Sequence, residues 1–418
     1  MKCAFLIVGE AGARFINVTK ETNMKCHLSA GLFVTVSFTI FGVVTMLHAE
    51  EPSPPASTEV NAVLQPYLDS HKIAGISTVI ADKNGNILYR NLLGYADIET
   101  KKSISENSTF WIASMTKMFA GASLMMLVDE GKVRLDDPVT GYIPQLEKWR
   151  VLEKGEDGVQ LLKPLEQPVT IRHLLSHTSG LTGGAEIQQV LGNDGIPLAA
   201  RALSSVTGPL QSQPGKKYAY GNQGMNIAAR IVEIVSRKPY EEFLQTRFFT
   251  PLGMTETTFW PNEDMIARLV TPYRLNPSKD GFVRGDFGYL KSPLNDRTYR
   301  YPEAGGGLFS TAHDILRYGL MLVNEGELDG KRYLSKEAIH VLRTEQTGET
   351  HVNYSLGYHL RNGMFGHDGA YGTDLSVNPD TGLTAVFMVQ CSGGHQWEAR
   401  DAFLRTAADV YAKAKTSR

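Results

Sequence analysis

This chain contains few cysteines, and its positive and negative charges nearly balance. Only three cysteines occur among the 418 residues, too few for a disulfide framework. The 42 Lys and Arg residues nearly balance the 44 Asp and Glu residues, giving a formal net charge of −2, and no basic block stands out. A nucleic-acid partner therefore has no electrostatic support.

Repeats, low-complexity tracts and compositional bias are missing as well. Hydrophobic residues make up 42% of the chain and charged residues 21%, values close to the globular average, so a disordered or fibrous chain is excluded. The length exceeds that of one ordinary core and predicts two domains, or one domain that carries a large insertion.

One long apolar run lies near the amino end. Residues 28–47 carry no charge, Lys25 precedes them and Ala49 follows. Read from Met24, this pattern is typical of a signal peptide, with residues 1–49 comprising that peptide and unused upstream residues. An uncleaved membrane anchor is the alternative, since about 20 apolar residues can span a bilayer. We expect an exported protein, periplasmic or secreted, that touches a membrane only through this segment if it is not cleaved.

After residue 49 the composition and the expected secondary structure change along the chain. Residues 50–58 are rich in Pro and Ser and indicate a linker. Residues 59–135 and 303–418 mix strand and helix patterns, including a hairpin with an Asn-Gly turn, and indicate one α/β domain. Residues 136–302 favour helices and indicate an inserted, mostly helical domain. The fold class expected is α+β, with an antiparallel sheet flanked by helices.

Individual elements follow from apolar spacing, capping residues and turn residues. Helices are predicted over residues 59–70, 115–130, 171–176, 196–203, 226–236, 240–249 and 397–414, with two more capped by Thr311 and Ser335. Strands are predicted over residues 75–82, 87–94, 354–360, 363–367, 375–378 and 383–391.

Ser114 and Lys117 stand three residues apart at the start of a predicted helix, one turn apart on one face. A serine hydroxyl needs a base nearby, and a lysine in a desolvated site loses its proton more easily. Free N–H groups at a helix start can face a developing oxyanion. The pair indicates a serine nucleophile assisted by lysine, although a Ser-x-x-Lys pattern also arises by chance in a chain of this length.

Tyr220 and Asn222 precede another predicted helix. A phenolate near two ammonium groups can act as a general base, and an Asn amide can hold a substrate carbonyl. Tyr89 and Asn91 have the same spacing, but they lie in the predicted hairpin, where a cross-strand structural role is favoured.

Gly366 to Ala370, with the sequence Gly-His-Asp-Gly-Ala, ends a predicted strand. Glycine here lets a ligand approach the backbone closely, and the Ala370 N–H can serve as an oxyanion donor. A lone His-x-Gly is usually only a turn.

Together, the order Ser-x-x-Lys, Tyr-x-Asn and His-x-Gly resembles the serine β-lactamase and penicillin-binding-protein superfamily. The resemblance is strongest to its class C-like branch, which contains class C β-lactamases, D-alanyl-D-alanine carboxypeptidases, D-aminopeptidases and family VIII esterases. Residues 171–181, 135–138 and 305–312 are similar to that branch too, and the resemblance extends over about residues 60–411. It implies a β-lactamase/transpeptidase-like fold.

The resemblance also implies roles for the candidate residues. Ser114 attacks a carbonyl and forms an acyl-enzyme that water then releases, while Lys117 and Tyr220 manage the proton. Asn222 positions the substrate and Lys117.

The third motif departs from the β-lactamases of this branch, which typically have Lys-Thr-Gly where this chain has His-Asp-Gly from His367. By resemblance, His367 replaces the third cation or hydrogen-bonds Tyr220, and Gly369 lies at the substrate. The amides of Ser114 and Ala370 form the oxyanion hole. Esterase-like and peptidase-like members often have His at this position, which puts β-lactamase activity in doubt.

The sequence thus predicts an exported serine hydrolase acting on short acyl esters or related amides. A D,D-peptidase or D-aminopeptidase, a weak β-lactamase, and a non-hydrolytic sensor that is acylated on its serine remain as alternatives. No cofactor or metal is expected, because His173 and His177 are four apart but lack a matching Glu and a third ligand. The partner expected is a small ester, amide or peptide, and the oligomeric state stays open.

Overall fold

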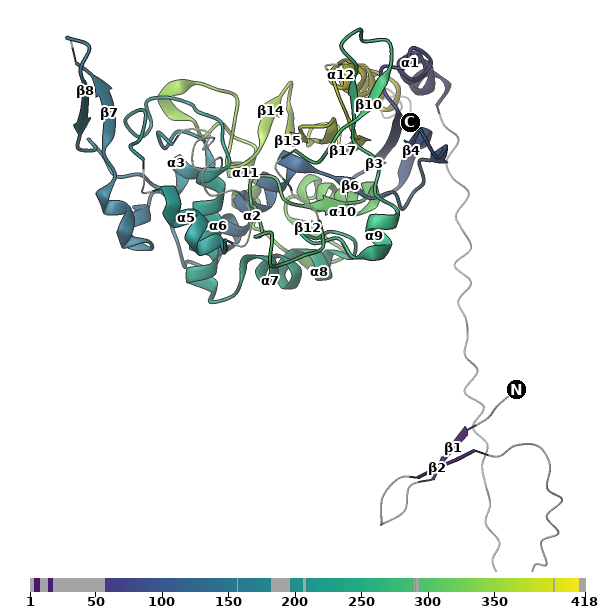
Figure 1. The fold of residues 1–418 in the computed structure, drawn as a ribbon, viewed down its shortest axis with the longest axis horizontal. Coiled ribbons are helices and arrows are strands. Elements are labelled where there is room, and N and C mark those ends of the chain that lie inside the picture. Colours follow the sequence, from purple (N-terminus) through teal and green to yellow (C-terminus); the bar gives the residue numbers. More distant parts are fainter. Residues whose placement is uncertain are drawn as a thin grey trace, which may run out of the picture. The chain divides into compact units, whose positions relative to one another are not determined.

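The computed structural model describes residues 4–7, 14–17, 57–155, 157–181, 196–205, 208–288, 290, 293–393 and 395–412 (Figure 1). The chain divides into two units, Met1–Glu51 and Pro52–Arg418. In the first unit, β1 (Ala4–Ile7) pairs with β2 (Arg14–Asn17) in antiparallel fashion. The predicted signal peptide, from Met24 to Ala49, lies outside the described residues. Among the helices that are described, none combines the length and the apolar character needed to cross a bilayer.

Seven strands of the second unit form one antiparallel sheet, in the spatial order β14, β15, β16, β17, β3, β4, β5 (Figure 1). β17 near the carboxyl end pairs with β3 near the amino end, from Leu383 opposite Asp82 to Val389 opposite Ile76. The predicted antiparallel sheet built from both ends of the chain is therefore confirmed. The strands are β3 (Gly75–Asp82), β4 (Ile87–Asp97), β5 (Lys102–Ser103), β14 (His359–Arg361), β15 (Met364–Gly369), β16 (Thr373–Asn378) and β17 (Leu383–Val389).

Helices cover both faces of this sheet (Figure 1). Successive side chains of β3 point to opposite faces, as in any strand. Ile76 and Ile80 join the core beneath α1 (Thr58–Asp69) and α12 (His395–Ala407), whereas Val79 and Ala81 join the core beneath α10 (Ala312–Val323). β3 is apolar on both faces because neither face meets water. α1 begins at Thr58, at the end of the predicted linker.

The block predicted as a helical insertion contains six described helices but does not form a separate core. α2 (Thr116–Asp129) is buried on all sides over residues 116–127, so other helices must cover it all round. α6 (Gln223–Ser236) supplies part of that cover, and one hydrophobic core runs through both helices. The other helices of the block are α3 (Ile171–Leu175), α5 (Leu198–Ser204), α7 (Tyr240–Leu244), α8 (Thr250–Leu252) and α9 (Glu263–Ala267).

Short strands tie the end of this block to the carboxyl-terminal region. β9 (Tyr273–Leu275) pairs with β10 (Phe282–Arg284) and, in parallel, with β18 (Cys391–Ser392). The predicted boundaries after residues 135 and 302 thus mark a change in element type within one compact unit. The remaining described strands and helix are β6 (Phe110–Trp111), β7 (Val151–Lys154), β8 (Gln160–Lys163), β11 (Phe309–Ser310), β12 (Glu327–Leu328), β13 (Lys331–Arg332) and α11 (Lys336–Leu342).

Two elements differ from the sequence prediction near the site. α6 begins at Gln223, three residues earlier than predicted, which makes Asn222 its N-cap. The strand predicted over residues 354–360 is confined to β14, because Gly357 takes φ +86° and interrupts the extended backbone. A Cβ at Gly357 would lie 2.4 Å from the Lys117 carbonyl oxygen, so this turn packs directly against α2.

Candidate active site

Ser114 lies in a single 3₁₀ turn, Ala113–Met115, between β6 and α2. Ala113 takes φ +44°, a left-handed conformation that costs about 1–2 kcal/mol for a residue with a Cβ. Hydrogen bonds hold the strained turn: the Thr116 hydroxyl donates to the Ala113 carbonyl at 2.6 Å, and the Thr373 hydroxyl donates to the Ile112 carbonyl at 3.2 Å. The sharp turn directs the Ser114 hydroxyl toward Lys117.

Lys117 is completely buried, and its Nζ has three polar neighbours. These are Ser114 Oγ at 3.1 Å, Asn222 Oδ1 at 2.8 Å and the Gly305 carbonyl oxygen at 2.6 Å. The two carbonyl oxygens can only accept hydrogen bonds. They take both hydrogens of a neutral amine, whose lone pair then faces the serine hydroxyl.

The electrostatics of the site agree with that geometry. Burial lowers the pKa of Lys117 to about 7, against the opposing effect of the nearby Glu303 carboxylate. A lysine with a pKa close to neutral has a large fraction of free amine at physiological pH, which suits a general base. The predicted pair of Ser114 and Lys117 is brought together as the sequence indicated.

Tyr220 is also brought to the nucleophile. Its side chain hydrogen-bonds Ser114, and Lys117 Nζ lies 4.6 Å from the centroid of its ring. Loss of hydration raises the pKa of Tyr220 above its usual value, so it is a phenol at neutral pH. The phenolate expected from the sequence would need ammonium groups beside it, whereas its nitrogen neighbour is a lysine with a lowered pKa. Tyr220 is 40% exposed and stands at the mouth of the site.

Asn222 contacts Lys117 from the start of α6. Its Oδ1 accepts from Lys117, and its Nδ2 donates to Glu303 Oε2 at 3.4 Å. The predicted contact with Lys117 is present, and the predicted contact with substrate stays a prediction.

His367 does not occupy the place expected for it. It is 1% exposed, its Nδ1 lies 2.7 Å from the Asp368 carbonyl oxygen, and its Nε2 lies 3.1 Å from the Tyr354 hydroxyl. Tyr354 therefore takes the hydrogen bond that we expected for Tyr220, whose ring centroid is 6.2 Å away. Burial, reinforced by neighbouring positive groups, lowers the pKa of His367 well below its usual value. His367 is thus neutral and cannot replace a cation.

The end of β15 meets the turn that carries Ser114. A Cβ at Gly369 would lie 2.3 Å from the Ile112 carbonyl oxygen, so only glycine fits there. Ala370 follows directly and is exposed. This placement suits backbone N–H groups of Ser114 and Ala370 as a pair of oxyanion donors, which stays a prediction.

Tyr220 is surrounded by rings of other side chains that the sequence did not place at the site. The ring centroids of His177, Tyr354 and His359 lie 4.6 Å, 6.3 Å and 6.4 Å from that of Tyr220. His177 was considered in the sequence only within the similar 171–181 segment and as a possible metal ligand with His173, not as a neighbour of Tyr220. No sequence signal pointed to Tyr354 or His359, because only the fold brings them close to Tyr220.

His173 and His177 do not form a helical pair. α3 ends at Leu175, and His177 takes φ +60° beyond it. His173 belongs to a capping box with Thr170 at the other end of the same short helix. The expected structural role of these residues fits this geometry.

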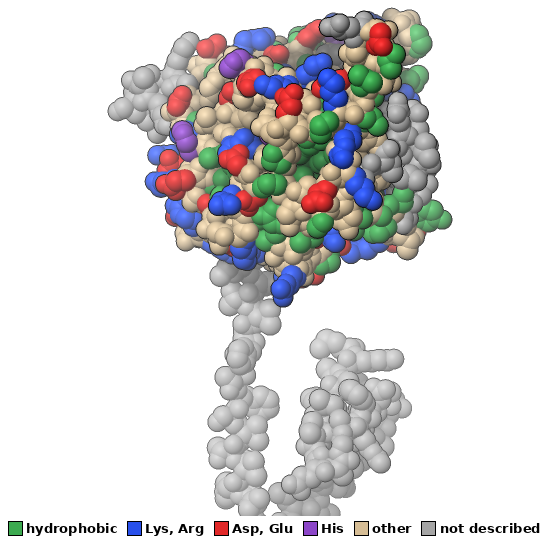
Figure 2. Space-filling model, turned by 90° about the vertical axis from the view of Figure 1, so that its left-hand side faces the viewer, with side chains coloured by type: hydrophobic (Ala, Val, Ile, Leu, Met, Phe, Trp, Pro, Cys, Tyr) green, Lys and Arg blue, Asp and Glu red, His purple; other side chains and the backbone are tan. Residues whose placement is uncertain are grey.

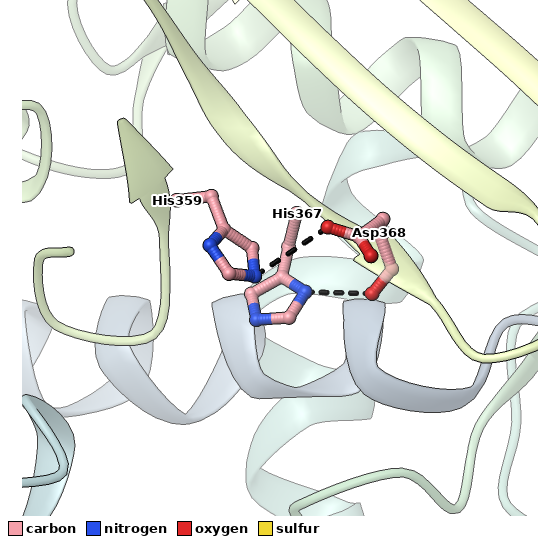
Figure 3. A group of neighbouring side chains, drawn as sticks. All are labelled: His359, His367 and Asp368. Atoms are coloured by element: carbon pink, nitrogen blue, oxygen red, sulfur yellow. Dashed lines mark hydrogen bonds and ion pairs between the residues drawn. The ribbon is translucent and has the colours of Figure 1, made fainter. Parts of the chain in front are cut away.

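Three side chains near the site could in principle bind a metal: His359, His367 and Asp368 (Figure 3). His359 Nε2 lies 3.4 Å from Asp368 Oδ1. Arg361 pairs with the same Asp368 oxygen, however, and both nitrogens of His367 are already hydrogen-bonded. A metal ion would have to displace the guanidinium and break the bond to Tyr354, so these residues do not fit a metal.

A serine in contact with a buried lysine of lowered pKa, with a tyrosine bonded to the same serine, is the arrangement of a serine hydrolase. The family model for Beta-lactamase matches residues 60–409, and the chain belongs to this family.

The chain is similar to several named proteins. Protein Rv1367c of Mycobacterium tuberculosis is 30% identical over 364 residues, covering 79% of this chain and 88% of that protein. Esterase EstB of Burkholderia gladioli is 28% identical over 286 residues, covering 62% of this chain and 68% of the esterase. The solved structure of EstCE1, described as a hydrolase with promiscuous acyltransferase activity, has a TM-score of 0.67 at 23% identity. That match covers 82% of this chain and 97% of EstCE1, and it shows the shared fold.

Proposed function

We propose that this protein is an exported serine esterase that cleaves short acyl esters or related amides through an acyl-enzyme on Ser114. The observation that carries the proposal is the position of Lys117 Nζ, 3.1 Å from Ser114 Oγ, with two carbonyl oxygens as its other partners. Similarity to Esterase EstB supports the ester as substrate.

The proposed reaction has two halves, acylation of Ser114 and hydrolysis of the acyl-enzyme, and Lys117 accepts and returns a proton in each. Lys117 takes the proton of Ser114 as Oγ attacks the carbonyl carbon, and the negative charge passes to the carbonyl oxygen. Tyr220 gives its phenolic proton to the leaving oxygen, the carbon–oxygen bond breaks, and Lys117 returns a proton to Tyr220. Water then attacks the acyl-enzyme, its proton passes to Lys117, and Ser114 Oγ leaves and regains a proton as the acid is released.

The charges around the mouth of the site favour a neutral substrate. His367 carries no charge. Arg361 is nearby, but it pairs with Asp368 and lies 3.2 Å from Asp374, so two carboxylates offset its positive charge. Figure 2 shows Lys and Arg side chains lying among Asp and Glu side chains over the face viewed there. Arg361 therefore offers no uncompensated positive charge to a substrate carboxylate, such as that of a β-lactam.

We expect the enzyme to turn over p-nitrophenyl butyrate with a much higher kcat/KM than nitrocefin. A hydrogen bond to a charged group is worth roughly 1.5–3 kcal/mol, so the missing cation lowers kcat/KM for an anionic substrate on the order of tenfold to a hundredfold.

Asp368→Asn removes one partner of Arg361 and is expected to raise kcat/KM for nitrocefin relative to that for the ester. Asp329→Asn, which removes the partner of Arg317 on the surface, is the matched control and should leave the ratio unchanged. A wild-type preference for nitrocefin contradicts the proposed substrate.

Export is the second part of the proposal, and it is supported by the pattern of Lys25, the apolar run and Ala49. Expression of the full chain in an exporting host is expected to yield a protein that begins after Ala49. The measurement is amino-terminal sequencing of the soluble exported fraction. An intact residue 28–47 segment in the membrane fraction would instead mean an anchored protein.

A further inference from the structure

Glu303 is a buried carboxylate next to the residues that hold the proposed general base. It is 2% exposed and was not selected by any sequence motif. Its Oε1 accepts from Asn226 Nδ2 at 2.9 Å and from the Gly305 backbone N–H at 3.2 Å. Its Oε2 accepts from Asn222 Nδ2 at 3.4 Å. Burying a carboxylate is costly without such donors, so its environment is built to hold a negative charge.

Two of these donors are the residues that accept hydrogen bonds from Lys117. Because Asn222 turns its NH₂ group toward Glu303, its Oδ1 faces Lys117. The Gly305 peptide lies directly on Asn222, since a Cβ at Gly305 would come within 2.4 Å of Asn222 Cγ. The carboxylate therefore orients the Asn222 oxygen that accepts from Lys117, and it anchors the backbone of Gly305, whose carbonyl is the second acceptor.

The other titratable side chains near Lys117 carry no charge at neutral pH. Burial and positive neighbours lower the pKa of His177 and His367, and they lower the pKa of His359 to about 3. The pKa of Tyr220 is raised. Among the described groups, Glu303 is thus the anion that opposes the effect of burial on the pKa of Lys117.

Two cationic groups lie farther out. Arg361 acts on Tyr220 from β14 and is offset by its own carboxylate partners. Arg201 hydrogen-bonds Tyr301, whose hydroxyl lies 3.5 Å from Asn226 Nδ2, so its guanidinium is linked to the Glu303 cluster rather than to Lys117.

We propose that Glu303 is a positioning residue for the general base: it holds the Asn222 amide and the Gly305 backbone N–H, and its negative charge stabilises the protonated form of Lys117. The inference rests on the proposed function, in which Lys117 is the base for Ser114. A base works best when its pKa lies near the working pH, and Glu303 opposes the lowering of the Lys117 pKa by burial.

Glu303→Gln should lower kcat/KM for p-nitrophenyl butyrate and move the acid limb of its pH profile to lower pH. The carboxylate stabilises the ammonium form, so its removal lowers the pKa of Lys117 and keeps the amine free in more acidic solution. We expect a shift of about one pH unit, at the low end of the range for opposite charges at close range. The rate falls because the Gln NH₂ group meets the NH₂ group of Asn222, which turns the Asn222 oxygen away from Lys117.

Two further variants separate charge from position. Glu303→Asp keeps the charge on a shorter side chain, so the acid limb should stay near its wild-type position while the rate falls. Asp314→Asn removes another buried carboxylate. The Thr257 hydroxyl and the Glu256 N–H each donate a hydrogen bond of 2.8 Å to Asp314 Oδ2. This variant controls for loss of stability and should leave the acid limb in place, even if thermal unfolding occurs earlier.

An acid limb that stays in place or moves upward in Glu303→Gln overturns the inference. Fluorophosphonate labelling of Ser114 in the wild-type protein, measured on the same preparation, distinguishes failure of the proposed function from failure of the Glu303 assignment. If Ser114 is not labelled, the proposed function fails. If it is labelled and the limb of Glu303→Gln is unmoved, only the assignment of Glu303 fails.

Discussion

Replacing Ser114 by Ala should abolish covalent labelling by a fluorophosphonate and reduce ester turnover by at least about 10³-fold, and Lys117→Met should cost a comparable factor. In the proposed reaction the lysine amine takes the serine proton, and its Nζ lies 3.1 Å from Ser114 Oγ. Methionine retains most of the side-chain length and suits the fully buried position. Residues that act as one unit are not additive, so the double variant should be little worse than either single one.

Lys132→Met is the matched control, because the side chain of Lys132 is 49% exposed and pairs with Glu130 on the surface. It removes the same charged group without touching the site and should retain wild-type turnover. The adduct is mapped by mass spectrometry of the labelled protein. Labelling that persists in Ser114→Ala would assign the nucleophile to another residue.

Tyr220→Phe should lower kcat by about 10²–10⁴-fold while KM changes little, the range expected when a positioned proton donor is lost. The substitution removes only the hydroxyl that bonds Ser114. The ring, with its contacts to His177 and Tyr354, stays in place. Because the pKa of Tyr220 is raised, the wild type should keep its activity through neutral pH without a basic limb from this phenol.

Tyr218→Phe provides the comparison for this variant. Tyr218 belongs to the same group of rings, with its centroid 5.8 Å from that of His177, so the change removes a hydroxyl from the same surroundings. Its kcat should remain near that of the wild type. Equal rates in Tyr220→Phe and wild type would remove Tyr220 from the proton path and leave Lys117 to protonate the leaving group.

Much of the fold and part of the site follow from the sequence, because the decisive patterns are local. The Asn-Gly turn lies between β3 and β4, which pair as predicted. Thr311 and Ser335 cap α10 and α11 with their own hydroxyls. Ser114 and Lys117 are one turn apart, so their contact needs little beyond the start of α2.

Other expectations failed or went unmade because they depend on what packs against a residue. The resemblance implied that His367 replaces a cation or hydrogen-bonds Tyr220, whereas β15 buries it against Tyr354, where its pKa is lowered. The sequence also could not show that loss of hydration raises the pKa of Tyr220, which favours its neutral form.

The sequence by itself determined the family, the antiparallel sheet between helices, and the contact between Ser114 and Lys117. Only the tertiary structure decided the state of that lysine. Its pKa depends on burial beneath α6 and on Glu303, which lies 186 positions further along the chain. Spacing along a chain records contacts within a turn or a hairpin, whereas hydration and electric field at a buried atom arise from segments that meet only when the chain folds.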